Sequence, residues 1–314
     1  MRAFAVSHFG EPPAVHELPI PDANDAVLIS VKFAGMNPID YKLVERLDAG
    51  STYPFVLGAD FSGRVERVPE GPGDFHVGDR IFGMARKHGS YADYASVALG
   101  DKASPVARIP DGVTDEQAAA LPIPAITALG SLELLGIRAN QTLVVMGASG
   151  SVGGYAVQMA RSRGAHVIAT VRGDADEARR LGAEEVYDTS SVDVIDAIRK
   201  TYPEGVDATL DLVNGPDAIK RDAEILKPGG RLVSTIYGAD EDWFAERQVK
   251  AHNIAGNSNP FSTPQGLTQV VQMLAAGTTI TARVQAIVEL NDAGQMLEKL
   301  KKGGLRGKAL IHIS

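Results

Sequence analysis

A glycine-rich run, Gly147–Gly153, constrains the fold of this 314-residue chain more than any other segment. It follows the apolar segment Leu143–Met146 and precedes a helical pattern that ends near Gly164. Glycines allow a tight turn close to a ligand, and the N–H groups at a helix start attract an anion. The run therefore predicts a turn that binds the pyrophosphate of a dinucleotide, although a plain strand-to-helix turn has the same spacing. The residues expected to line this ligand are Gly147, Ser149, Gly150, Ser151, Val152 and Gly153.

The pattern of the chain on either side of this run predicts two architectures. The N-terminal part holds short strand-like runs such as Ala26–Phe33, Gly63–Val68 and Tyr91–Val97, which turn residues separate as in antiparallel sheets. After Gln141, strand-like runs alternate with helical patterns, which is typical of a parallel sheet covered by helices on both faces. We therefore expect an α/β protein.

The expected elements can be placed by residue. In the parallel region they are strands at Thr142–Met146, His166–Val171, Ala208–Leu212 and Arg231–Ile236, and helices at Val152–Arg163, Asp174–Leu181 and Asp217–Leu226. Before that region, the helical stretch Thr114–Leu135 is broken by Pro122 and Pro124. Near the C-terminus we expect a helix at Pro264–Ala276, a strand at Ile280–Leu290, a helix at Asp292–Lys301 and a strand at Gly307–Ile313.

The composition excludes several classes of protein. The chain has no cysteine, which excludes disulfide scaffolds, cysteine-ligated zinc, iron–sulfur clusters and thiol nucleophiles. Its net charge of −8 argues against general binding to nucleic acid or to anionic membranes. The N-terminus lacks the continuous apolar segment of a signal peptide, and the uncharged stretch Gln117–Leu132 is too short to span a bilayer. We expect a cytoplasmic protein that acts on a small-molecule substrate.

The end of the second parallel strand indicates which dinucleotide binds. Folds that bind NAD usually carry a carboxylate there, which accepts hydrogen bonds from the ribose hydroxyls. This chain has Arg172 at that place, and an arginine suits the 2′-phosphate of NADPH. Asp174 and Asp176 are the competing ribose contacts, but Asp174 also matches a helix-capping residue. We expect NADPH as the cofactor.

Several segments of the chain occur together in a recognisable order. They are Gly35–Asp40, Leu57–Gly63, Val77–Gly83, Gly89–Tyr94, Ala118–Leu129, Gly147–Gly153 and Arg306–Lys308. Along essentially its whole length the chain resembles the zinc-independent quinone oxidoreductase and enone reductase branch of the medium-chain dehydrogenase/reductase superfamily. The resemblance implies a β-rich, GroES-like substrate domain (residues 1–117 and 259–314) and a Rossmann domain with a doubly wound parallel sheet (residues 118–258).

The departures from the zinc-containing members concern the metal ligands. Zinc members have a cysteine where this chain has Asn37, and Gly-His-Glu where it has Gly58–Asp60. The seven histidines are spread singly, without the spacing of a metal site. We therefore expect no metal.

The resemblance also implies an activity. Relatives transfer hydride from NADPH to quinones or to the C=C bond of α,β-unsaturated carbonyls. Without zinc, the developing enolate oxygen needs hydrogen-bond donors or the ribose hydroxyl of the cofactor. Two alternatives stay open, namely a zinc-free carbonyl reductase or alcohol dehydrogenase, and an NADPH-binding structural or RNA-associated protein with little turnover.

The candidate catalytic residues are Asn37, Asp40, Tyr41 and Tyr91. By the resemblance, Asn37 lies in the loop near the substrate, where its amide orients a carbonyl or else only holds the loop. Asp40 likewise either takes part in catalysis or only forms structural hydrogen bonds. Tyr41 and Tyr91 can donate a proton, or they can pack against neighbouring groups.

Further candidates come from the resemblance alone. Thr127, Tyr237 and Lys308 are expected near the cofactor, with Arg306 and Lys308 alternatively forming a solvated terminal turn. Asn259–Phe261 resembles a loop at the substrate entrance. The segment Lys250–Asn257 reads as an edge strand, and pairing with its copy across a two-fold axis would give a homodimer.

Overall fold

The computed structural model describes residues 1–23, 25–70, 74–85, 89–98, 104–173, 175–254, 259–275 and 280–313. The chain divides into two compact units. Unit 1 comprises Met1–Ile123, Ser262–Ala276 and Ala282–Ser314, and unit 2 comprises Pro124–Phe261 and Gly277–Thr281. Within the described residues, no helix is long and apolar enough to cross a membrane.

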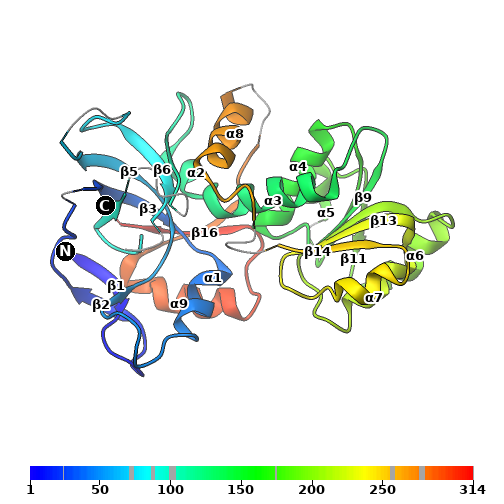
Figure 1. Ribbon diagram of the computed structural model, residues 1–314, viewed down its shortest axis with the longest axis horizontal. Coiled ribbons are helices and arrows are strands. Elements are labelled where there is room, and N and C mark those ends of the chain that lie inside the picture. The colour runs from blue at the N-terminus through cyan, green and yellow to red at the C-terminus, as the bar shows by residue number, and fades with distance from the viewer. Residues whose placement is uncertain are drawn as a thin grey trace. The chain divides into compact units, whose positions relative to one another are not determined.

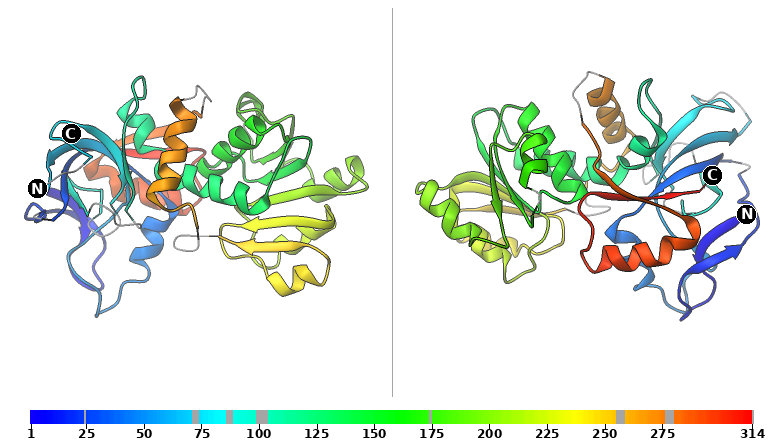
Figure 2. Two further views of the ribbon diagram at one scale, coloured as in Figure 1. Left: turned by 45° about the horizontal axis from the view of Figure 1, so that its top comes forward. Right: turned by 180° about the vertical axis from the view of Figure 1, so that it is seen from behind.

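Unit 2 is built on a six-stranded sheet in the order β11-β10-β9-β12-β13-β14, in which every pairing is parallel. Its strands are β9 (Thr142–Met146), β10 (His166–Val171), β11 (Glu185–Asp188), β12 (Val206–Asp211), β13 (Leu226–Ser234) and β14 (Lys250–Asn253). The helical elements are α3 (Pro122–Leu135, whose first residues belong to unit 1), α4 (Ser151–Ser162), α5 (Ala175–Arg180), α6 (Val194–Thr201), η1 (Ile219–Glu224) and α7 (Glu241–Ala245). Helix α4 covers one face of the sheet, and α6 and α7 lie on the other (Figures 1 and 2).

The strand order reverses between β9 and β12, because the chain runs outward from β9 through β10 and β11 and then returns to the other side of β9. Such a reversal leaves a crevice at the carboxyl ends of the two strands, where doubly wound sheets bind their ligands. The glycine run follows β9 directly, so it lies at this crevice.

Unit 1 contains a three-stranded sheet, β2-β1-β4, and a seven-stranded sheet, β15-β16-β3-β5-β6-β8, in which β7 also pairs with β3. Its strands are β1 (Arg2–Val6), β2 (Ala14–Glu17), β3 (Val27–Gly35), β4 (Phe55–Val56), β5 (Asp60–Arg67), β6 (Arg80–Met84), β7 (Tyr94–Val97), β8 (Val106–Arg108), β15 (Val284–Glu289) and β16 (Lys308–His312). Its helices are α1 (Pro38–Val44), α2 (Asp115–Ala119), α8 (Pro264–Ala275), η3 (Leu290–Asp292) and α9 (Ala293–Lys301). The expected α/β class, with a GroES-like antiparallel unit and a Rossmann-type parallel sheet, is confirmed.

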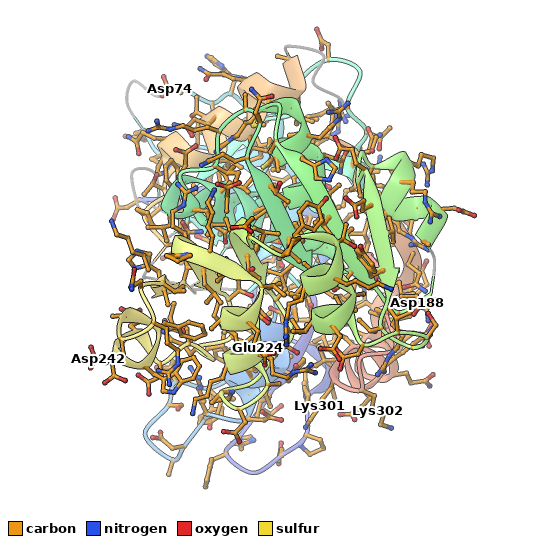
Figure 3. All side chains as sticks on the ribbon, turned by 90° about the vertical axis from the view of Figure 1, so that its right-hand side faces the viewer. Asp74, Asp188, Glu224, Asp242, Lys301 and Lys302 are labelled. Atoms are coloured by element: carbon orange, nitrogen blue, oxygen red, sulfur yellow. The ribbon has the colours of Figure 1, made fainter. Side chains whose placement is uncertain are left out.

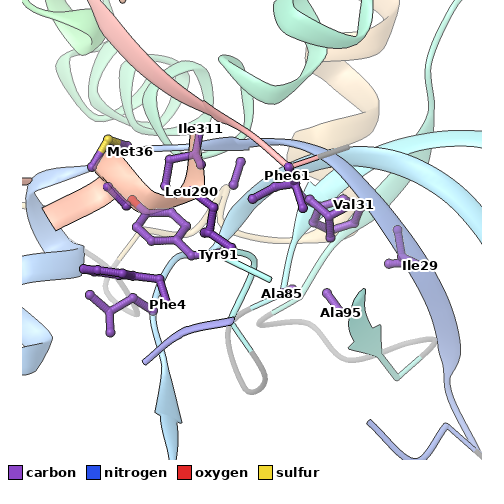
Figure 4. Close-up of a cluster of buried hydrophobic side chains, with 14 of the residues drawn as sticks. Phe4, Ile29, Val31, Met36, Phe61, Ala85, Tyr91, Ala95, Leu290 and Ile311 are labelled. Atoms are coloured by element: carbon purple, nitrogen blue, oxygen red, sulfur yellow. The ribbon is translucent and has the colours of Figure 1, made fainter. Parts of the chain in front are cut away.

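The apolar core of unit 1 gathers side chains from both ends of the chain. Phe4, Phe61 and Tyr91 pack with Leu290 and Ile311 in one cluster (Figure 4). Charged side chains such as Asp242 and Lys302 extend from the surface instead (Figure 3). Since burial of each large apolar side chain is worth about 1.5–3 kcal/mol, this cluster holds β16 against β3 and brings Lys308 into unit 1.

The helical stretch Thr114–Leu135 is interrupted just before Pro122, as expected, because α2 ends at Ala119 and α3 begins at Pro122. Both prolines lie in the first turn of α3, where a missing N–H costs no intrahelical hydrogen bond. Other sequence expectations are corrected by the structure. The helix expected at Asp217–Leu226 is the short 3₁₀ helix η1. The strand expected at Tyr91–Val97 begins only at Tyr94.

Candidate functional site

The turn after β9 depends on glycine at two of its positions. Gly147 has a φ of +88°, a conformation that residues with a Cβ rarely adopt. Its N–H donates to the Thr170 hydroxyl at 3.0 Å, and the Ala148 N–H donates to the Thr170 carbonyl at 2.9 Å. At Gly153, a Cβ would lie 2.4 Å from the Gly147 carbonyl oxygen. The first and last glycines of the run are therefore required for the turn itself.

The middle glycine, Gly150, has a different role. It is the N-cap of α4, has ordinary extended angles, and offers no side chain to the N–H groups of the first turn. A Cβ there would lie 3.5 Å from the nearest atom, which is ordinary contact. Helix starts need acceptors for their N–H groups, and a phosphate oxygen is a suitable one. The turn thus brings together all six residues expected from the sequence, with Ser149, Ser151 and Val152 half-buried around it.

The next wall of this crevice follows β10. Arg172 is exposed there, as a residue that contacts a 2′-phosphate must be. Asp176, the alternative candidate for contact with the ribose, forms an ion pair with Arg179 at 3.0 Å. The capping role expected for Asp174 lies outside the described residues.

The loops after β12 and β13 form the opposite wall. Val213 lies against the glycine turn, since a Cβ on Gly147 would lie 2.6 Å from Val213 Cγ1. Tyr237 is 60% exposed and has a φ of +59°, a strained angle for a residue with a side chain. Tyr237 belongs to unit 2, and its expected contact with the cofactor stays a prediction. Sequence reasoning missed Val213, although its position just after a parallel strand could have indicated it.

Unit 1 contains a buried polar cluster centred on Asp60. The Lys308 ammonium lies 2.9 Å from Asp60 Oδ2 and 2.6 Å from Asn37 Oδ1. Asn37 donates from Nδ2 to Asp60 Oδ2 at 2.9 Å and to the Gly35 carbonyl at 3.2 Å. The other oxygen of Asp60 accepts the Ile123 N–H at the start of α3.

These contacts show whether Lys308, Arg306 and Asn37 are exposed or held inside unit 1. Lys308 is 2% exposed, so the alternative of a solvated terminal turn is wrong for it, whereas Arg306 is exposed. The amide of Asn37 is buried, and both its oxygen and its nitrogen have partners within unit 1. In this arrangement Asn37 holds its loop and has no donor left for a substrate carbonyl.

Asp40 and Tyr91 form a second buried pair beside this cluster. The Tyr91 hydroxyl donates to Asp40 Oδ2 at 2.6 Å, and the Asn37 backbone N–H donates to the same oxygen at 2.7 Å. Burial raises the pKa of Asp40 to about 7, against the lowering effect of these hydrogen bonds. Burial and the neighbouring Asp40 raise the pKa of Tyr91 as well. Tyr91 is fully buried, and its phenol donates its hydrogen bond to Asp40.

The remaining candidates differ in their exposure. Tyr41 is half-buried at the edge of the unit 1 core, with its ring 6.0 Å from the Lys301 ammonium. Thr127 is half-buried on α3. Asn259 is buried and donates to the Ile126 carbonyl at 3.1 Å, so its amide fixes the chain against α3. Among the described residues, no group of three or more His, Cys, Asp or Glu side chains could hold a metal ion.

The raised pKa of Asp40 predicts how stability depends on pH. The folded protein binds this proton more tightly than the unfolded chain, so raising the pH from about 4 to about 7 should cost about 3 kcal/mol of stability. Asp40→Asn removes the titration, while its amide oxygen can still accept from Tyr91 and from the Asn37 N–H. Urea unfolding across this pH range should therefore show the variant gaining stability relative to the wild type as the pH rises. Asp176→Asn, at a fully exposed carboxylate, is the control. Parallel pH profiles for Asp40→Asn and the wild type would contradict the assignment.

Two family models match the chain. The alcohol dehydrogenase GroES-like domain matches residues 23–111, in unit 1. The model described as zinc-binding dehydrogenase matches residues 151–276, which include most of the parallel sheet.

Individual proteins match over nearly the whole length. The quinone oxidoreductase of Sus scrofa is 32% identical over 293 residues, covering 89% of this chain and 87% of that protein. That of Mus musculus is 31% identical over 330 residues, covering 99% of this chain and 97% of that protein. The solved quinone oxidoreductase from Coxiella burnetii has a TM-score of 0.85 at 26% identity, covering 100% of this chain and 99% of that one. The chain therefore belongs to the medium-chain dehydrogenase/reductase superfamily and is an oxidoreductase of the quinone oxidoreductase-like type.

Proposed function

We propose that this protein transfers hydride from NADPH to quinones or to the C=C bond of α,β-unsaturated carbonyls, without a metal. The glycine turn carries this proposal, because it places the uncapped start of α4 at the crevice between β9 and β12. The similarity to quinone oxidoreductases supports the choice of substrate class. The absence of cysteine and the alanine at position 59 support chemistry without zinc.

We propose that NADPH binds through residues of unit 2. The N–H groups at the start of α4 would hold the pyrophosphate, and the exposed Arg172 would contact the 2′-phosphate. Tyr237 and Thr127 are proposed to contact the cofactor further along. Lys308, which we expected there, is engaged with Asp60 and Asn37, so we assign it to holding unit 1 together.

When bound, NADPH supplies the hydride at C4 of its nicotinamide. The chain must then orient an electron-poor substrate and provide hydrogen bonds for the charge that develops on the enolate oxygen. Of the four catalytic candidates, Tyr41 keeps an accessible surface, and we propose it as the group that contacts the substrate. Asn37, Asp40 and Tyr91 are proposed as its supporting framework, because their polar atoms bond to one another and to unit 1.

We also propose a homodimer that forms through β14. This strand is an edge of the parallel sheet, as the sequence predicted, and it pairs only with β13 among the described strands. Residues 255–257 of the expected interface lie outside the described residues. An unpaired edge favours pairing with a second copy. A mass measurement in solution should give about twice the 33.2 kDa of one chain, and a monomer at micromolar concentration would exclude this arrangement.

The glycine turn allows a test in which the fold and cofactor binding separate. Gly153→Ala should destabilise the protein, because its Cβ would lie 2.4 Å from a backbone oxygen. Gly150→Ala should fold normally but bind NADPH about 10-fold or more weakly, since its methyl group occupies space that the pyrophosphate needs. Gly154→Ala, whose Cβ would lie 3.4 Å from Leu181 Cδ1 and 4.0 Å from the Ala148 carbonyl oxygen, is the matched control. Thermal melting and NADPH titration of the three variants measure the two effects. Unchanged NADPH affinity in Gly150→Ala would place the pyrophosphate elsewhere.

Cofactor choice is tested at Arg172. A charge-assisted hydrogen bond is worth about 1.5–3 kcal/mol, so Arg172→Ala should weaken NADPH binding by about 10- to 100-fold. NADH has no 2′-phosphate, so its affinity should stay nearly unchanged. Dissociation constants for both cofactors give the answer, and equal losses would refute the contact. Arg179→Ala, which removes a nearby arginine already paired with Asp176, is the control.

The reaction itself is tested with NADPH carrying deuterium at C4 and a simple enone. Hydride transfer to a conjugated C=C bond should place the label on the β-carbon of the product. A label on the carbonyl carbon, giving an allylic alcohol, would identify a carbonyl reductase instead. Product analysis by mass spectrometry and NMR distinguishes the two outcomes.

A further inference from the structure

Asp222 carries an enclosed carboxyl group that the proposed function does not use. It lies on η1 and is 1% exposed. Neither of its oxygens receives a hydrogen bond from an N–H or hydroxyl donor of the described residues. Its close neighbour is Asp211, the last residue of β12, which is also fully buried. Burial, reinforced by Asp211, raises the pKa of Asp222 well above its usual range.

The surroundings of the two carboxyl groups show which one holds a proton. Asp211 Oδ1 accepts the backbone N–H groups of Val213 at 2.8 Å and Asn214 at 2.7 Å. Asp211 Oδ2 accepts the Asn214 side-chain amide at 2.6 Å. Three donors of the described residues thus bond to Asp211 and none to Asp222, and two adjacent buried carboxyl groups do not both ionise. The proton therefore belongs on Asp222, whose O–H can donate to Asp211.

The loop that Asp211 holds is a wall of the nucleotide crevice. Val213 lies against Gly147, because a Cβ added to Gly147 would lie 2.6 Å from Val213 Cγ1. The carbonyl oxygen of Asn214 lies 2.6 Å from the Cβ position of Gly238, in the loop after β13. A displacement of the β12 loop would therefore disturb both the glycine turn and the segment that carries Tyr237.

We propose that Asp222 is a positioning residue for the dinucleotide, whose hydrogen bond to Asp211 fixes the β12 loop beside the glycine turn. Cofactor binding is thereby linked to one proton within unit 2. The inference rests on the proposed function, because it presumes that the glycine turn binds a dinucleotide.

Other charged groups near Asp222 do not replace this hydrogen bond. Arg221, on the same element, favours the ionised carboxylate, but its guanidinium pairs with Asp193 of α6 at 2.9 Å. Asp196 of α6 and Glu224 of η1 also lie within 4 Å of that guanidinium. The charge of Arg221 is therefore shared among carboxylates at the surface, while the neighbour of Asp222 in the interior is Asp211.

The test compares Asp222→Asn and Asp222→Ala with the wild type. NADPH and NADH affinities are measured from about pH 6 to about pH 10, with thermal melting in the same buffers. Wild-type affinity should fall as the rising pH removes the proton from Asp222, by about 10-fold once the group is fully ionised, whereas Asp222→Asn, whose amide still donates to Asp211, should keep a nearly constant affinity. Asp222→Ala should bind about 10-fold more weakly than the wild type at neutral pH. Asp193→Asn, at the surface carboxylate that pairs with Arg221, is the control and should follow the wild type.

The same pH profile in Asp222→Asn and the wild type would overturn the proposal, as would wild-type affinity in Asp222→Ala. Hydrogen exchange of the Val213 and Asn214 amides, measured without cofactor at about pH 9, is an independent readout. Those amides should exchange about 5-fold faster in the wild type than in Asp222→Asn, and equal rates would also overturn the proposal. If no form binds either dinucleotide at any pH, the proposed function fails, while the exchange rates still report on the bond to Asp211.

Discussion

The Asp60 carboxylate is the contact on which the organisation of unit 1 depends. It accepts hydrogen bonds from the Lys308 ammonium of β16, from the Asn37 side-chain amide at the start of α1 and from the Ile123 backbone N–H at the start of α3. Removing one partner of a buried ion pair costs about 3–5 kcal/mol, because the other charge is left without compensation. The C-terminal strand β16 is thus tied to the starts of α1 and α3 through one carboxylate, which adds to the apolar contacts that hold it in unit 1.

Unit 2 obtains its proposed binding capacity in a different way, mainly from the backbone. Its sheet is parallel, so the carboxyl ends of β9, β10, β12 and β13 meet at one edge. The loops that leave this edge are fixed by buried side chains beneath them, Thr170 under the glycine turn and Asp211 under the β12 loop. Thr170 and Asp211 therefore position N–H groups and do not need to contact the anion themselves.

Local sequence patterns predicted the parts of the fold that local physics determines. The strands Thr142–Met146 and His166–Val171 have the predicted bounds, because continuous apolar runs between turn residues mark buried parallel strands. Helix α6 was missed although Val194, Ile195 and Ile198 have helical spacing. Strand β11 has four half-buried residues and no apolar alternation that could identify it. The contact of Lys308 with Asn37 spans 271 positions, so only the assembled fold could show that both are buried.

The distribution of charge around the glycine turn follows from the ligand it is proposed to bind. The chain has a net charge of −8, which opposes a dinucleotide phosphate at long range. Charges beyond about 10 Å are largely screened at 0.1 M salt, so the groups close to the turn decide whether the anion binds. There the start of α4 presents N–H groups, Arg172 is exposed, and the charge of Asp211 is balanced by N–H donors of its own loop. An ionised Asp222 would add a second negative charge behind that loop, so a proton on this residue serves both the packing of the crevice wall and the electrostatics of an anion site.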